Sequence, residues 1–152
     1  MLDYPTAIAT TRDPSAIRSE LSTAVVRATA ELAVPEDVLS AAVSELTSPV
    51  SAELYSDLLG MPATCRVTFH VDNKATGDDT YLAAYPAMGL AAIRLGEVLD
   101  AEMCLTFQLD RVVMRRRGGS VVLYDWFRWW SSPELAPRLA RNSTMTSDDG
   151  RI

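Results

Sequence analysis

The sequence predicts an α+β fold, with a mixed or mainly antiparallel sheet of about four to five strands and two long helices on one face. Apolar and polar residues alternate from Cys65 to Val71, which is typical of a half-buried strand. Apolar residues recur at helical spacing in residues 14–33 and 82–99, which predicts two helices that each pack one face on the sheet. Gly118 and Gly119 join two apolar segments and accept the positive φ of a two-residue hairpin turn.

The N-terminal part of the chain predicts further elements. Residues 2–9 fit a short strand, which Pro5 would restrict to an edge of the sheet because proline has no N–H to donate. Pro14 suits the first turn of the first long helix. Residues 38–46 fit either a helix or a strand, since both periodicities are present. Residues 49–58 predict a short helix that ends before a glycine.

The C-terminal part predicts strands and a final short helix. The second long helix contains Pro86, so it either kinks there or begins its regular part there. The strands are expected at residues 103–107, 111–116 and 120–124, and the last helix at residues 132–139. We expect one domain over residues 1–141 and a disordered polar tail over residues 142–152.

Composition and charge exclude several classes of protein. With 152 residues, 48% of them hydrophobic, the chain can build one core that buries roughly 70% of its unfolded surface. The net charge is −6, and residues 31–100 hold eleven acidic side chains against three basic ones. Because an acidic domain repels phosphate backbones, no nucleic-acid partner is expected. The N-terminus lacks the pattern of a signal peptide and no apolar run is long enough to span a bilayer, so we expect a cytoplasmic protein with no membrane partner.

The residues that usually carry catalysis are sparse. The single histidine, His70, lies on the polar face of its predicted strand and has no neighbouring nucleophile in the sequence. Cys65 and Cys104 fit small buried residues that stay reduced. Together with His70 they lack the paired spacing of a zinc site, so no metal or cofactor is expected. The chain is therefore predicted to bind a partner rather than to act as an enzyme.

The C-terminal hairpin and the aromatic run that follows it are the most distinctive features. Three arginines, residues 115–117, gather near the hairpin turn, where solvated charges are common. The aromatic residues between positions 126 and 130 lie too close in sequence for all of them to point inward. They either cap the open edge of the core or remain exposed as anchors for a protein partner, and Trp126, Arg128 and Trp129 are the candidates for such anchors.

Several segments together resemble a known family. They are the N-terminal LDY, the strand ATCRVTFHVDNK with the long helix after it, the hairpin LTFQLDRVVMRRRGGSVVLYD, and the terminal element SPELAPRLA. The hairpin matches a strand that begins with Phe107 and runs into an Arg-Arg-Gly-Gly turn at residues 116–119. Over residues 1–140 the chain thereby resembles the swarming-inhibition toxin immunity family, third type.

This resemblance implies a partner and a mode of action. Members are small bacterial proteins that bind a cognate toxin and occlude or distort its active site, with no catalytic residue of their own. A basic toxin surface would attract an acidic rim, for which the candidates are Glu53, Asp57, Asp72, Asp78 and Asp79. Helix capping is the simpler account of Asp78 and Asp79 taken alone. The resemblance also favours a strand for residues 38–46.

Two other functions remain open at this point. An acidic secretion chaperone for an effector protein would share the small α+β form, but it would bind an extended segment along its sheet as a homodimer. An enzyme of an unrecognised type is the third possibility, and no constellation of residues supports it.

Overall fold

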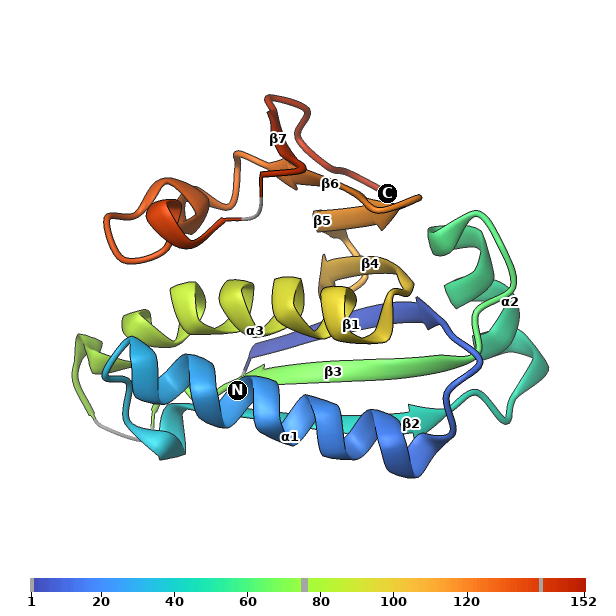
Figure 1. The fold of residues 1–152 in the computed structure, drawn as a ribbon, viewed down its shortest axis with the longest axis horizontal. Helices are drawn as coiled ribbons and strands as arrows, with labels where there is room; N and C mark the ends of the chain where they lie inside the picture. Colours follow the sequence, from blue (N-terminus) through green and yellow to red (C-terminus); the bar gives the residue numbers. More distant parts are fainter. Residues whose placement is uncertain (1, 75–76, 140) are drawn as a thin grey trace.

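A seven-stranded mixed sheet runs through the protein in the order β2-β3-β1-β4-β5-β6-β7 (Figure 1). The structure is a computed structural model and describes residues 2–74, 77–139 and 141–152. Neighbouring strands are antiparallel except β6 and β7, which are parallel. The strands are β1 (Leu2–Ala9), β2 (Leu39–Glu45), β3 (Cys65–Val71), β4 (Glu102–Phe107), β5 (Arg111–Arg117), β6 (Ser120–Tyr124) and β7 (Ser143–Thr146).

Helices cover both faces of this sheet. The α-helices are α1 (Pro14–Glu31), α2 (Pro49–Leu59) and α3 (Ala84–Leu99), and the short 3-10 turns are η1 (Glu36–Val38), η2 (Asp79–Ala83), η3 (Arg128–Ser131) and η4 (Ala136–Arg138). The long helices α1 and α3 lie side by side on one face (Figure 1). Consecutive strand residues point to opposite faces: Ile8 joins the core beneath α1 and α3, and Ala7 joins a smaller core with Leu58 of α2.

The α+β class and the mixed sheet are confirmed, but the predicted element count is wrong. The described residues form seven strands and three α-helices, instead of about four to five strands and two helices. Residues 38–46 resolve as strand β2, paired in register with β3. The helix α3 begins at Ala84 and is preceded by η2, so Pro86 falls within its first turn, where a missing N–H leaves no helical hydrogen bond unmade.

The first strand occupies the middle of the sheet, so its predicted edge position is wrong. β1 pairs with β3 along its length and with β4 only from Thr6 to Ala9. The ladder with β4 therefore stops next to Pro5, where an N–H would otherwise be needed. On this side the Thr106 hydroxyl donates a hydrogen bond to Pro5 O at 2.8 Å, so the proline carbonyl is still satisfied.

The C-terminal residues form structure where a disordered tail was predicted. Residues 143–146 form β7, which extends the sheet beside β6. Beyond it, Val112 N–H donates to Gly150 O at 2.7 Å, and Ile152 N–H donates to Asp110 O at 3.1 Å. The prediction is wrong because these residues are held by backbone hydrogen bonds, which leave no apolar pattern in the sequence.

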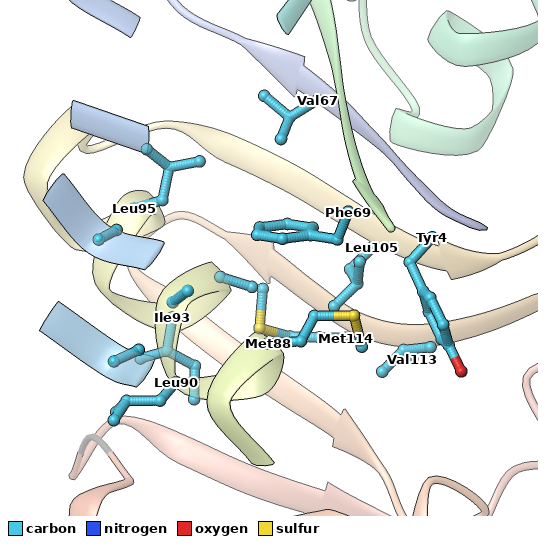
Figure 2. Packing of buried hydrophobic residues seen from close by; sticks show 14 of the residues in the cluster. Tyr4, Val67, Phe69, Met88, Leu90, Ile93, Leu95, Leu105, Val113 and Met114 are labelled. Atoms are coloured by element: carbon cyan, nitrogen blue, oxygen red, sulfur yellow. The ribbon is translucent and has the colours of Figure 1, made fainter. Parts of the chain in front are cut away.

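The main core lies between the sheet and the two long helices. Figure 2 shows Phe69 of β3 and Met114 of β5 packed against Met88 of α3. Nearly every residue of α3 is buried, because α1, the sheet and the buried Trp130 surround it. The segment Asp79–Leu99 is long and apolar enough to cross a membrane by length and composition, and 72% of its most apolar window is buried inside the protein, as in a core helix.

The three arginines near the hairpin turn, residues 115–117, donate hydrogen bonds to carbonyls at the end of α2 and just beyond the end of α3. Alternation along β5 sends Arg115 and Arg117 to the α2 face, where their guanidinium groups donate to Leu58 O at 2.7 Å and Leu59 O at 2.5 Å. Arg116 points to the other face and donates to Ala101 O at 2.8 Å and to the Asp100 carboxylate at 3.0 Å. Arg116 is buried and Arg115 is partly buried, so only Arg117 keeps the solvent exposure expected of a charged tip, because carbonyls at the end of α2 and just beyond α3 recruit these cations.

Candidate protein-binding surface

Several predicted binding residues converge at one end of the molecule. Asp72 follows the last residue of β3, and its N–H donates to Val38 O at 3.0 Å, which places it beside η1 and the exposed Asp37. Asp3 lies on the neighbouring strand, opposite His70. In Figure 1 this is the left side, where the loop before α3 and the turn after α1 come together. We call it the acidic–aromatic end, and its charged members are Asp3, Asp37, Asp72, Asp78, Asp79, Lys74 and Arg128.

Local backbone contacts hold the carboxylates of this end. Asp72 accepts a hydrogen bond from Lys74 N–H at 3.0 Å, and Asp78 accepts one from Thr80 N–H at 2.8 Å, which caps η2. The capping interpretation of Asp78 is therefore confirmed. Asp79 is exposed in the first turn of η2. Residues 75 and 76 of the acidic loop lie outside the described residues. These contacts orient the Asp72 and Asp78 carboxylates, of which Asp72 is partly exposed and Asp78 exposed.

The other two predicted acidic residues lie elsewhere. Glu53 and Asp57 are exposed on α2, at the right side of Figure 1. The chain passes from α2 into the first residue of β3, whereas Asp72 follows the last residue of that strand. Seven residues of strand separate the two sites by roughly 20 Å. The predicted rim is thus two separate groups: Asp57 borders a hollow that Tyr124 also lines, and the other group lies at the end that carries the partly exposed Trp129.

The aromatic run divides between the core and the surface. Phe127 and Trp130 are buried, and Trp130 Nε1 donates to Val113 O at 3.2 Å. Trp126 is partly exposed, donates to Val112 O at 2.6 Å, and lies beneath the Arg111 guanidinium, which is 4.0 Å from its ring centroid. The run was expected either to cap the core or to remain exposed. Two of its four rings lie in the core and two lie at the surface, so each alternative holds for part of the run.

Trp129 is the partly exposed ring that reaches the acidic end. It stacks on Tyr85 with centroids 5.4 Å apart and planes 11° apart, and the Arg128 guanidinium lies 4.6 Å from its centroid. Its edge borders a hollow of about 320 Å³ that is mostly apolar, with Leu82 and Pro86 in its wall and Glu134 nearby. Burial raises the pKa of Tyr85, so its hydroxyl stays protonated as the ring supports Trp129.

No sequence pattern signals this hollow directly. Leu82 fitted a buried helical position, but it lies in η2, before α3, and is only partly buried. Asp3 and Asp37 were also missed, because each becomes part of the group only through pairing of β1 and β2 with β3. An acid at the start of a strand is not by itself a signal of a surface.

The two cysteines are buried, and the single histidine is paired with an aspartate. Burial raises the pKa of the Cys65 and Cys104 thiols, which keeps them protonated and weakly nucleophilic. His70 Nδ1 lies 2.7 Å from the Asp3 carboxylate across two strands. In the described part of the chain, no group of three or more histidine, cysteine or acidic residues is placed to hold a metal ion. What the structure brings together at this end is surface charge and aromatic contact.

Taken together, these observations describe a small α+β protein whose acidic–aromatic end combines exposed carboxylates with a partly exposed tryptophan. The sequence model of the SitI3-like family matches residues 2–134, so the chain belongs to that family, as its resemblance to the swarming-inhibition toxin immunity proteins indicated. A search of curated proteins gave no match to the sequence. A solved structure with similarity is a chain of the "CdiA-CT/CdiI toxin and immunity complex from Burkholderia pseudomallei", with a TM-score of 0.49 and 14% identity over 72% of this chain and 93% of that chain.

Proposed function

We propose that this protein is an immunity protein that binds a cognate bacterial toxin and neutralises it by occlusion. Membership of the SitI3-like family over residues 2–134 is the observation that carries this proposal. The protein acts in the cytoplasm, where a delivered toxin meets its targets. The toxin contacts the acidic–aromatic end, because charge and rigid aromatic area coincide there.

Charge supports rapid capture of a basic toxin. Five aspartates gather at this end, against Lys74 and Arg128, and Arg111 covers the ring of Trp126. A carboxylate surface that faces a basic cleft steers the encounter, so that association exceeds about 10⁶ per molar per second at low salt. Enzymes that cleave phosphate backbones commonly present such clefts, and a protein bound over the cleft excludes the substrate. Neutralisation then needs no chemistry from the immunity protein.

The aromatic part supports tight binding once the partners meet. Trp129 is held between Tyr85 and Arg128, so it loses little conformational freedom when a partner covers it. Tryptophan and arginine next to an apolar hollow are typical of the few residues that dominate binding energy. Trp126, fixed by its hydrogen bond to Val112 O, extends the same surface.

Co-expression tests the proposed function. The toxin encoded beside the gene of this protein is expressed in a sensitive cell with and without the immunity protein. Survival only when both are present supports the proposal. Cell death in both cultures, with both proteins folded and abundant, contradicts it. A secretion chaperone would instead co-purify with an unfolded effector segment and leave the folded toxin active.

The acidic end makes a kinetic prediction. Replacing Asp72, Asp78 and Asp79 together by asparagine keeps the oxygen that caps η2 but removes three charges, so association with the toxin should slow roughly tenfold at low salt and depend less on salt. Stopped-flow fluorescence measures both quantities. The matched control replaces Glu53 and Glu97 by glutamine and Asp57 by asparagine, which removes three exposed charges from other parts of the surface. Equal on-rates for the two triple variants would remove the acidic end from the interface.

A further inference from the structure

The strand β2 forms an edge of the sheet that carries none of the usual protection. It pairs with β3 on one side, and no other described strand pairs with its outer side. Its sequence, LSAAVSE, has no lysine, no proline and a single charge, Glu45 at its end, and its register with β3 shows no bulge. Natural edge strands usually carry a lysine, a proline or a bulge, because an open row of unpaired backbone N–H and C=O groups can pair with another chain.

The hydrogen-bond pattern shows which residues of β2 present their backbone to that open side. Asp72 N–H donates to Val38 O, one step before the first ladder pair, Leu39 with Val71. In an antiparallel ladder, hydrogen-bonded pairs alternate with pairs that are not bonded to each other. The even-numbered residues of β2 therefore bond to β3, and the odd-numbered residues 39–45 direct their N–H and C=O groups outward.

An apolar hollow of about 380 Å³ lies beside this edge, between α1 and β2. Its wall includes Leu21, Val25 and Val26 of α1, and Val26 is 61% exposed. The odd-numbered side chains of β2 pair with Val67, Phe69 and Val71, so they face the same side as α1. A strand added to β2 would direct every second side chain into this hollow, which apolar residues would fill.

The charges near the two ends of β2 indicate which kind of chain would pair with it. The strand begins at the acidic–aromatic end, where Asp37 precedes it and Asp72 lies beside it. A second copy of this chain, paired antiparallel about Ala42, would place the Glu45 of each copy diagonal to the Asp37 of the other, and like charges at that spacing repel. An incoming segment with a basic residue at this end would be attracted instead.

We propose that β2 takes up an extended segment of the toxin as an added strand, with apolar residues at alternate positions and a basic residue next to Asp37 and Asp72. This inference rests on the proposed function and deepens it. Contact at the acidic–aromatic end would then continue along the edge of the sheet, and backbone hydrogen bonds would fix the orientation of the toxin.

The outward backbone groups allow a selective test. Ala41→Pro removes an N–H that points to the open side, so it costs no hydrogen bond to β3 but blocks an added strand. The matched control is Ser40→Thr, which changes an exposed side chain outside the hollow and leaves the outward backbone groups intact. We expect Ala41→Pro to weaken toxin binding at least about tenfold and Ser40→Thr to leave it unchanged, as measured by isothermal titration with the toxin encoded beside the gene.

Amide hydrogen exchange gives an independent readout on the wild-type protein. The amides of Ala41 and Val43 should exchange rapidly in the free protein and become protected in the toxin complex, whereas those of Ala42 and Ser44 should be protected in both. If Ala41→Pro unfolds the protein, Val43→Lys replaces it, since an inward-pointing charge also blocks edge pairing.

The outcomes separate this inference from the proposed function. A toxin that is neutralised and bound equally by wild type and Ala41→Pro, with Ala41 and Val43 unprotected, overturns the added strand and leaves the immunity function intact. A failure of the wild-type protein to protect cells overturns both. A wild-type dimer that Ala41→Pro dissociates, seen by analytical ultracentrifugation, would show that a second copy covers the edge and would also overturn the inference.

Discussion

At the scale of single residues, Gly89 shows how closely the core is packed. A Cβ atom at this position of α3 would lie 2.7 Å from Trp130 Cζ3 and 3.1 Å from Cη2. The indole is fixed by its hydrogen bond to Val113 O and cannot easily move away. Glycine in a helix normally costs about 1 kcal/mol relative to alanine, so its presence here reflects close approach of the ring to the helix.

Gly89→Ala should therefore lower the free energy of unfolding by roughly 1 kcal/mol, because overpacking outweighs the gain in helix propensity. Urea denaturation measures the change. Gly96→Ala is the comparison in the same helix: its Cβ would meet Arg116 Cδ and Met103 Sδ at 2.9 Å, both in buried side chains, so it should be destabilising as well. A Gly89→Ala protein more stable than wild type would show that Trp130 is not held against α3.

At the scale of elements, the arginines of β5 determine how α2 is held to the sheet. Arg115 and Arg117 each donate to a carbonyl in the last turn of α2, and Gly60 ends the helix with a φ of 75°. A helix of this length is marginal alone, so its position depends on these contacts and on the small core beneath it. Arg116, on the opposite face, donates to Ala101 O, two residues beyond the last residue of α3.

Arg115→Met keeps the aliphatic stem but removes the donor to Leu58 O, so it should destabilise the protein by about 1–2 kcal/mol. Hydrogen exchange should accelerate in the last turn of α2 before it does so in α1. The control is Arg27→Met, which removes an exposed arginine from α1. Equal urea midpoints for the two variants would mean that α2 is held by its apolar contacts alone.

At the scale of the whole molecule, Glu31 joins three segments distant in sequence. Its carboxylate accepts hydrogen bonds from Arg94 of α3 at 2.6 Å and from Arg138 of η4 at 2.8 Å. The hydrogen bond from Arg94, followed by that from Arg138, lowers the pKa of Glu31 from 4.5 to about 2. Because the folded state holds the ionised form, this contribution to stability is present above pH 4.5 and is lost as the pH falls towards 2.

Glu31→Gln should lower the melting temperature at pH 7, and its difference from wild type should shrink as the pH falls from about 4.5 to about 2. Thermal melts across this range measure the difference. Glu20→Gln, which removes a more distant 3.8 Å contact with Arg12, serves as the control. A difference that does not change with pH would show that the carboxylate charge plays no part in joining the segments.

The sequence alone determined the class of the fold and most of its elements, because their periodicity is local. The alternation in residues 65–71, the helical spacing of residues 14–33 and the Gly118-Gly119 turn each specify structure through neighbouring residues, and their predicted elements are found. Membership of the SitI3-like family could also be recognised from the sequence, because it rests on motifs along the chain.

Only the tertiary structure decided which residues act together. Sheet pairing brought Asp3, Asp37 and Asp72 to one end and left Glu53 and Asp57 at another. The arginines of β5 donate hydrogen bonds to backbone carbonyls, as Arg115 does to Leu58 O at the end of α2. Residues 143–146 form a strand through their backbone pairing with β6. These outcomes depend on contacts between positions far apart in the chain, and such contacts leave no periodic trace in the residues themselves.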